Sequence, residues 1–506
     1  MNNYHLPTLP VEAMPVTMLA TDELETKRAE LHRVLDLFGL HCYEISASPG
    51  PFVTQWNVKL HKDTHMPSAI KIQKDLLKEL SIKGGRLMIS KDLKSIAFET
   101  VNDNPQHVTL GALLSTQEYQ DTSMDLPCAL GLTVEGKPFI IDLTKVPHLI
   151  VGGNTGFECN VVHTILASLL CKKRPDELKL MLIDTRRLEF SVYSEIAGPF
   201  LVTDPMAEQV IISDIDIATY AINSLRQMME ERYRLLETIN AFNIKDYNDK
   251  LSKGLLPQEE RYAFMPYVVV AISDFKDLIQ ARGKEVEAPL VMIAQKSRTV
   301  GIHLVISTGL LSPYVLTGII KGNFPGRIST WVRGKFESQI ILDREGAEQL
   351  DVRSDLLFYN DAESIRIQGA PIGQDERELK DICHQISLQC SDKCPMLLPR
   401  LDDEMKVNEN SPQKRVGRYV FEYTDPLFEE VARFVVNSQC ASPSMVQRQF
   451  QISYNRAFRL LQMLESLRIV SRLTSSYIRN VLVADIETLQ SILQCNKEQE
   501  MKQLTK

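Results

Sequence analysis

Residues 147–161 read Pro-His-Leu-Ile-Val-Gly-Gly-Asn-Thr-Gly-Phe-Glu-Cys-Asn-Val, an apolar run that ends in two glycines before a second apolar segment begins. Similar near-continuous apolar runs recur between helical segments, at residues 178–183, 267–272 and 303–307. Strands buried on both faces have this composition, and the helices between them supply parallel crossovers. The pattern predicts an α/β domain with a parallel sheet over residues 110–400.

The turn between residues 148–151 and the apolar helix after it stands where a phosphate-binding loop belongs. The consensus of that loop is G-x-x-x-x-G-K-[ST]: glycines let backbone N–H groups cradle phosphate, the lysine reaches the β- and γ-phosphates, and the hydroxyl binds magnesium. Here Glu158, Cys159 and Asn160 replace the second glycine, the lysine and the hydroxyl residue. The candidate nucleotide-binding positions of the loop are Gly153, which matches the first glycine, Asn154, Thr155, Gly156, Phe157, Glu158, Cys159 and Asn160.

Several segments outside the loop carry a family resemblance. They are Pro147–Val151, Leu182–Asp184, Leu188–Tyr193, Glu230–Tyr233, Tyr247–Asn248, Ala294–Arg298, Gly301–Leu304, Ile341–Asp343 and Gly346–Leu350. These segments resemble the motor of the FtsK/SpoIIIE family of DNA translocases, and the resemblance extends over nearly the whole chain, from Ser48 to Arg479. It implies a RecA-like P-loop NTPase fold and a role on double-stranded DNA in chromosome segregation and cell division.

The resemblance and the residue pattern together predict six successive parts of the chain. They are a flexible N-terminus (1–22), a small α+β domain (23–109), the RecA-like motor (110–400), a polar linker (401–418), a winged-helix DNA-binding domain (419–484) and a helical tail (485–506).

The second half of the expected nucleotide site is altered as well. In the family an apolar strand ends in Asp-Glu, whose carboxylates support magnesium and polarise the attacking water. Here the corresponding strand ends in Ser273-Asp274, so the magnesium carboxylate is replaced and Asp274 is the residual catalytic candidate. The family's Thr-Gln-Arg run after the next strand reads Thr308-Gly309-Leu310.

The loss of the lysine alone has a large electrostatic effect. A lysine about 4 Å from a phosphate contributes roughly 4 kcal/mol at an effective dielectric constant near 20, which corresponds to about a thousandfold in affinity or rate. Glu158 adds a carboxylate facing the same anion. We interpret Glu158 and Cys159 as drift at a site that no longer turns over ATP; the alternative is that they cap the helix or contact a partner.

The carboxyl-terminal domain contains a helix-turn-helix pattern. Ser442-Pro443 starts one helix, and a second helix from Tyr454 has an apolar face with helical spacing. Residues 444–484 hold six arginines and one acid, whereas the whole chain has a net charge of -8. A recognition helix presents its base-reading residues near its start. The candidate DNA-binding residues are Gln447, Arg448, Tyr454, Asn455, Arg456, Arg459 and Arg479.

Two further expectations concern assembly and location. RecA-type motors place ATP between subunits of a ring, and Arg298 and Arg327 lie in segments that resemble family interface segments. We therefore expect a homo-oligomer, a hexamer by analogy, or a mixed ring with an active paralogue; a site-specific recombinase and division proteins are further partners by analogy. We expect a cytoplasmic location, because the sequence has no run of about 18 uncharged apolar residues.

Three functions remain open at this point. The first is a DNA-binding pseudo-ATPase with no bound cofactor. The second is a working ATP-dependent translocase with a non-standard site, in which case ATP and magnesium are its cofactors. The third is a coupling or scaffold subunit of a secretion or division machine, with the winged helix reused for protein contacts. The altered loop favours the first, and no metal site is expected elsewhere.

Overall fold

The computed structural model describes most of the chain up to residue 399 and parts of the remainder. The described residues are 4–15, 21–61, 79, 86–89, 95–153, 156–257, 262–351, 354–360, 363–370, 372, 376–390, 394–399, 427–439, 441–452, 457, 460–461, 464, 469–471, 481–483 and 489–490. They divide into two compact units, residues 1–402 and 403–506, each with its own hydrophobic core.

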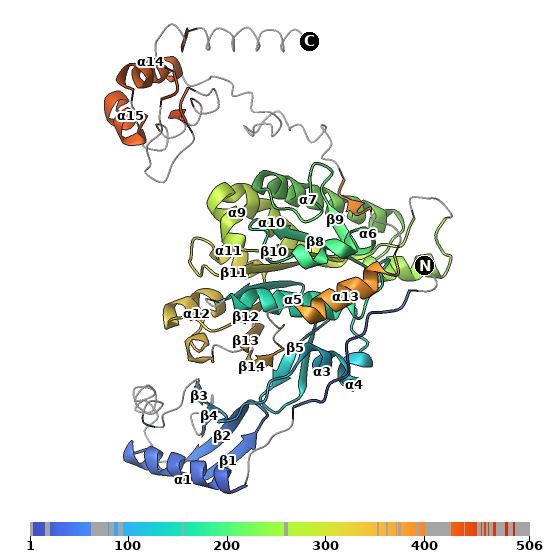
Figure 1. Ribbon diagram of the computed structural model, residues 1–506, viewed down its shortest axis with the longest axis vertical. Coiled ribbons are helices and arrows are strands. Elements are labelled where there is room, and N and C mark those ends of the chain that lie inside the picture. The colour runs from blue at the N-terminus through green and yellow to red at the C-terminus, as the bar shows by residue number, and fades with distance from the viewer. Residues whose placement is uncertain are drawn as a thin grey trace. The chain divides into compact units, whose positions relative to one another are not determined.

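A large twisted sheet forms the centre of the first unit (Figure 1). Its parallel part runs in the order β15 (Met396–Leu397), β9 (Leu201–Thr203), β8 (Leu178–Asp184), β10 (Tyr267–Ser273), β11 (Ile302–Thr308), β7 (His148–Gly152) and β12 (Gly326–Ser329). Four antiparallel strands continue it: β13 (Asp355–Asn360), β14 (Glu363–Gly369), β5 (Pro127–Thr133) and β6 (Pro138–Asp142). The expected parallel sheet is confirmed, and the antiparallel extension is an addition to it.

The sheet buries both faces. Along β7, Leu149 and Val151 join one core cluster and Ile150 joins the other, as expected for side chains that alternate across a strand. Residues of α5 (Phe157–Leu170) and α13 (Arg377–Ser387) fill the first cluster. The second cluster contains residues of α7 (Ile215–Thr238), α9 (Phe275–Arg282) and α10 (Lys284–Lys296).

Shorter helices connect these elements. They are α3 (Leu110–Leu114), α4 (Gln117–Gln120), η1 (Ser191–Ile196), α6 (Ala197–Phe200), α8 (Ile244–Ser252), η2 (Ser297–Val300), α11 (Gly318–Asn323), α12 (Lys335–Leu342) and η3 (Ala347–Gln349). Among the described residues, no helix combines the length and the apolar character needed to cross a membrane.

A small α+β part precedes the motor. Helix α1 (Thr21–Leu37) packs on an antiparallel sheet in the order β1 (Cys42–Pro49), β2 (Val53–Leu60), β4 (Ser95–Val101) and β3 (Arg86–Ile89). A buried ion network joins this sheet to the motor: Arg366 of β14 donates from Nε to Asp355 at 3.1 Å and from Nη1 to Glu99 of β4 at 3.2 Å. The first residues of the chain, 4–15, lie against α13 in a segment where a flexible terminus was expected.

The second unit has the core of the expected helix-turn-helix. Helix α14 (Phe428–Ser438) and α15 (Pro443–Phe450) pack with the buried side chains of Ala457, Leu460, Leu461 and Leu464. These four residues include most of the predicted apolar face of the second helix. An antiparallel bridge between Val470 and Val481 closes the base of the predicted wing, whose tip lies outside the described residues.

Candidate functional site

The altered loop lies at the carboxyl edge of the parallel strands. Gly152 at the end of β7 is level with Thr308 at the end of β11, and Ser273 at the end of β10 is level with Asp184 at the end of β8. Ligands of open α/β sheets bind at this edge. The two altered sequence motifs therefore lie at the same edge of the sheet, at the ends of β7 and β10, with β11 between them.

Two glycines keep the loop's backbone shape. A Cβ on Gly153 would lie 1.7 Å from Thr330 Oγ1, so only glycine fits there. Gly156 has a φ of 75°, a left-handed conformation, directly before α5 begins at Phe157. Phe157 is half-buried against the core, while Asn154 and Thr155 lie outside the described residues. Both ends of the turn thus depend on glycine, as the consensus loop does at its first position.

Glu158 is buried in the first turn of α5. Only 7% of its surface is exposed, and burial raises the pKa of its carboxyl group to about 7, with further increases from Asp274 and Glu189. Its Oε1 lies 3.0 Å from the position that a Cβ on Gly309 would take, so the side chain packs against the end of β11. Among the described residues its Oε2 has no hydrogen-bond partner. The carboxyl group of Glu158 thus lies between the start of α5 and the end of β11.

The neighbouring Cys159 and Asn160 are engaged within the chain. Burial raises the pKa of the Cys159 thiol above its usual range, and the thiol donates a hydrogen bond to the carboxylate of Glu189. A thiol at this position stays neutral and supplies no positive charge. The backbone oxygen of Asn160 accepts from Thr164 Oγ1 at 2.9 Å.

The side chain of Ser273, at the end of β10, is buried and contacts the end of β8. Ser273 Oγ donates to Asp184 Oδ1 at 3.2 Å. The other oxygen of the same Asp184 carboxylate accepts from the backbone N–H groups of Glu189 and Phe190, at 2.8 and 3.0 Å. Asp184 therefore shapes the loop after β8, and Ser273 supports it.

Asp274 is held by two cations. It has a φ of 47°, and its carboxylate contacts Arg186 Nε at 2.8 Å and Lys276 Nζ at 3.1 Å. Arg186 Nε also lies 3.1 Å from Asp277. The positive charges beside the altered loop are thus paired with carboxylates of the chain. Arg186, Lys276 and Asp184 were missed as site residues, although Arg186 comes three residues after a predicted strand on the same sheet edge.

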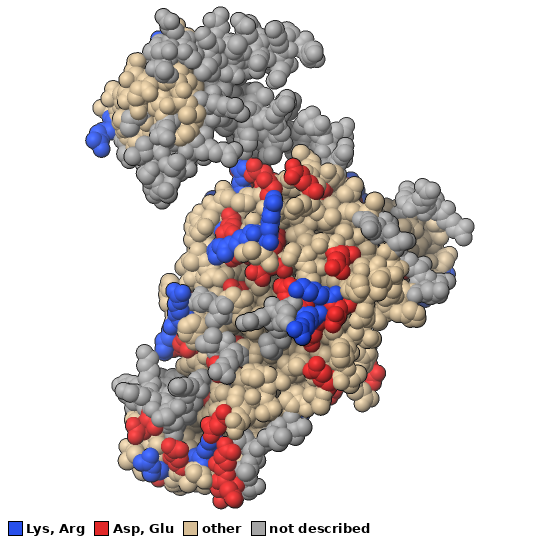
Figure 2. Space-filling view, in the orientation of Figure 1, with Lys and Arg blue, Asp and Glu red and all other residues tan. Residues whose placement is uncertain are grey.

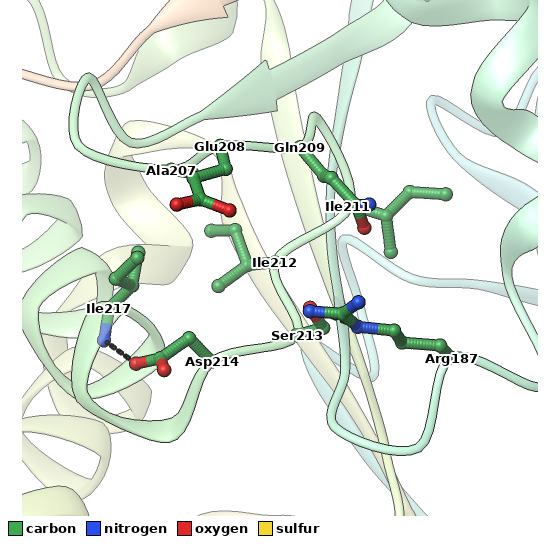
Figure 3. A pocket seen from close by; sticks show the side chains of 9 residues that line it. All are labelled: Arg187, Ala207, Glu208, Gln209, Ile211, Ile212, Ser213, Asp214 and Ile217. Atoms are coloured by element: carbon green, nitrogen blue, oxygen red, sulfur yellow. Dashed lines mark hydrogen bonds between the residues drawn. The ribbon is translucent and has the colours of Figure 1, made fainter.

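A cavity of about 140 Å³ lies near the end of β8, beside the start of α7 (Figure 3). Arg187 donates from Nε to Ser213 Oγ at 2.9 Å, and Asp214 caps α7 by accepting from the backbone N–H of Ile217. The cavity is also lined by Glu208, and none of the candidate nucleotide positions lines it. It is a separate hollow from the altered loop.

The other candidate residues have different surroundings. Arg298 is exposed, whereas Arg327 is buried, pairs with Asp343 and donates from Nη2 to the Lys321 backbone oxygen at 3.1 Å. Within one chain Arg327 is therefore occupied by internal contacts, and its place at a subunit interface stays a prediction. In Figure 2, basic and acidic side chains are intermixed on the visible face of the molecule.

Part of the predicted DNA-reading set is placed by the structure. Gln447 and Arg448 are exposed on α15. The five others, Tyr454, Asn455, Arg456, Arg459 and Arg479, lie outside the described residues. Ala457 and Leu460, which the sequence predicts on the apolar face of the second helix, are buried in the core of this unit.

Comparisons with known proteins extend over the same regions. The family model described as FtsK/SpoIIIE family matches residues 109–315, the FtsK alpha domain matches residues 8–99, and the FtsK gamma domain matches residues 422–484. The solved structure of the pCW3 conjugation coupling protein TcpA, in a monomer form with ATPγS, covers 72% of this chain and 100% of that chain with a TM-score of 0.50 at 19% identity. That likeness supports the P-loop ATPase-like fold.

Two relatives of this chain are each named DNA translocase FtsK. The Haemophilus influenzae protein is 33% identical over 475 residues, covering 90% of this chain and 87% of the relative. The Chlorobaculum tepidum protein is 34% identical over 478 residues, covering 93% of this chain but 57% of the relative, so this chain spans little more than half the length of that protein. With this identity over nearly its whole length, the chain belongs to the FtsK/SpoIIIE family of DNA translocases.

Proposed function

We propose that this chain binds double-stranded DNA through its carboxyl-terminal domain and does not hydrolyse ATP at its own nucleotide site. The observation that carries the proposal is the buried Glu158 carboxyl group at the loop position where the consensus has glycine. Its support comes from the chemistry of the loop and from the charge of the carboxyl-terminal domain.

The residues around the loop do not fit a nucleotide with magnesium. A triphosphate at the loop would lie beside the carboxyl group of Glu158, whose pKa is about 7 because it is buried. The negative phosphates and an ionised Glu158 would repel each other, so each disfavours the other at this site. Cys159 supplies a neutral thiol in place of a lysine. The nearby Arg186 and Lys276 are already bound to Asp274, and separating them from it opposes phosphate binding.

Hydrolysis also lacks its usual metal ligands. Ser273 replaces the expected magnesium carboxylate, and its hydroxyl donates a hydrogen bond to Asp184. Asp274 is the remaining acidic candidate, and it is paired with Arg186 and Lys276. A general base needs a free carboxylate within reach of the attacking water. We therefore assign Asp274 no catalytic role.

The carboxyl-terminal domain carries the charge needed for DNA. Residues 444–484 hold six arginines against one acid, in a chain whose net charge is -8. Arginines that neutralise phosphates release counterions, which makes DNA binding salt-dependent. Gln447 and Arg448 are exposed on α15, the helix before the recognition helix, where they are free to contact DNA. Two relatives named as DNA translocases over most of this chain agree with a DNA partner.

The assembly follows from the same proposal. RecA-type rings bind ATP between subunits, so a chain that does not bind nucleotide gains no stabilisation from it. We propose a weak homo-oligomer that joins a mixed ring with an active paralogue, with exposed Arg298 available at the contact. Sedimentation of the chain with long duplex DNA, alone and with the paralogue, measures this.

Two titrations test the proposal on the full chain. Labelled ATP with magnesium should show no binding at micromolar concentrations, and labelled duplex DNA should bind with an affinity that falls steeply with salt. Micromolar ATP affinity would instead favour the working translocase. Failure to bind DNA at low salt would favour the coupling or scaffold subunit, whose winged helix contacts protein.

A further inference from the structure

The first described segment of the chain, residues 4–15, has no regular secondary structure and lies along the motor (Figure 1). The hydrogen-bond partners of His5 and Thr8 are more than 370 positions away in the sequence. Such a long-range arrangement costs conformational entropy, so specific contacts must hold it. The contacts come from α13 and from the region around Gly111.

Two glutamines, one helical turn apart, bind the backbone of the segment. The Gln389 side chain accepts from the His5 N–H at 2.7 Å and donates to the His5 backbone oxygen at 2.9 Å. The Gln385 side chain does the same for Thr8, at 3.0 and 2.9 Å. A primary amide can donate and accept at once, so each glutamine satisfies both polar groups of one residue, as a neighbouring strand would.

Side chains of the segment on either side of these bonds pack against the motor's core. The ring of Tyr4 packs edge-on against Phe200, with centroids 6.4 Å apart, and Leu9 and Met14 pack against the same core cluster. Glu12 accepts a hydrogen bond from Thr109 Oγ1 at 2.6 Å. The segment is therefore anchored at its start, middle and end.

One glycine makes room for the backbone of the segment. A Cβ on Gly111 would lie 2.8 Å from the Pro10 carbonyl oxygen. Gly111 is in α3, where an alanine would otherwise favour the helix. The close approach explains a glycine at this helical position.

We propose that this face of the motor, formed by Gln385, Gln389, Phe200, Thr109 and Gly111, is a binding site for an extended polypeptide, and that residues 4–15 of the same chain are its occupant. The glutamines bind backbone groups, whereas the apolar contacts select an aromatic residue followed by spaced apolar residues. The site is distinct from the altered loop and from the DNA-reading domain. The occupant is exchangeable, because it is held by side-chain hydrogen bonds and packing rather than by a sheet ladder.

Hydrogen exchange of the full chain tests the hydrogen bonds. In the wild type, the amides of His5 and Thr8 should exchange slowly within the peptide that covers residues 4–15. In a Gln385→Ala, Gln389→Ala variant they should exchange at least about tenfold faster. His384→Ala, at an exposed position of the same helix, is the matched control and should exchange as the wild type does. Unchanged protection in the double variant would overturn the proposal.

Two experiments test whether residues 4–15 of the same chain occupy the site: varying the chain concentration and adding a free peptide. Protection that rises with chain concentration would mean that a second copy supplies the segment, which overturns the assignment to the same chain. A labelled peptide with the sequence of residues 4–15 should bind a full chain carrying Tyr4→Ala, and adding Gln385→Ala and Gln389→Ala should abolish binding. No binding to the Tyr4→Ala chain would show that the site does not accept a free segment. Tyr4→Phe, which keeps the ring, should retain the wild-type protection.

Discussion

Replacing Glu158 by Gln should stabilise the first unit at alkaline pH and have little effect at acidic pH. Burial raises the pKa of the Glu158 carboxyl group from 4.5 to about 7, so the folded chain favours the protonated form. The contribution of Glu158 to the free energy of unfolding is therefore highest below pH 4.5 and decreases as pH rises to 7. Each pKa unit corresponds to about 1.36 kcal/mol, which gives an ionised Glu158 a cost of about 3 kcal/mol above pH 7.

Urea unfolding at pH 4.5 and at pH 8 measures this difference. The chain has two tryptophans, Trp56 and Trp331, and both lie in the first unit, so their fluorescence follows that unit alone. Glu158→Gln should exceed the wild type by about 3 kcal/mol at pH 8 and match it at pH 4.5. Glu237→Gln, at an exposed position of α7, is the matched control. A variant without a pH-dependent gain would refute the buried, raised-pKa carboxyl group.

Three other predictions follow from the same structure. Restoring Gly, Lys and Ser at positions 158–160 together with Ser273→Asp should recover magnesium-dependent ATP binding, measured with labelled ATP; a correctly folded variant that still binds none would contradict the role given to these positions. Arg366→Met should lower the free energy of unfolding by about 3–5 kcal/mol, because it leaves the buried carboxylate of Asp355 without its cation and removes the nearer of the two cations beside Glu99; tryptophan fluorescence in urea measures it, and a loss below about 1 kcal/mol would contradict it. We expect Arg456, near the start of the recognition helix, to read bases and Arg479, on the wing, to contact phosphate. Arg456→Ala should therefore cost about 1–3 kcal/mol on a preferred DNA sequence and flatten the preference, whereas Arg479→Ala should weaken all sequences alike; anisotropy across salt concentrations separates the two, and equal effects would contradict these two roles.

The sequence predicts the parallel sheet well, because its central strands are buried on both faces and are uniformly apolar. The antiparallel strands β13 and β14 could not be predicted in this way. In β14 the charged Arg366 is buried, and only its pairing with Asp355 and Glu99 makes that burial possible. Such pairing joins residues far apart in the chain and leaves no local pattern.

The candidate site was only partly predictable for the same reason. The loop positions 153–160 and the strand end at Ser273 follow from motif spacing. The pairing of Arg186 with Asp274 depends on neighbouring strand ends, which requires the strand order. The sequence predicts a flexible N-terminus, and the contacts that hold residues 4–15 are not visible in it because Gln385 and Gln389 lie at the other end of the motor sequence.

The central claim is that a chain of this family binds DNA without turning over ATP. The most direct measurement is phosphate release by the full chain with saturating ATP, magnesium and long duplex DNA, under conditions where DNA binding has been verified. The relative from Haemophilus influenzae, assayed in parallel, is the positive control. We predict no DNA-stimulated release above the protein-free background. Release that depends on DNA and is abolished by Asp274→Asn would contradict the account and establish a working nucleotide site.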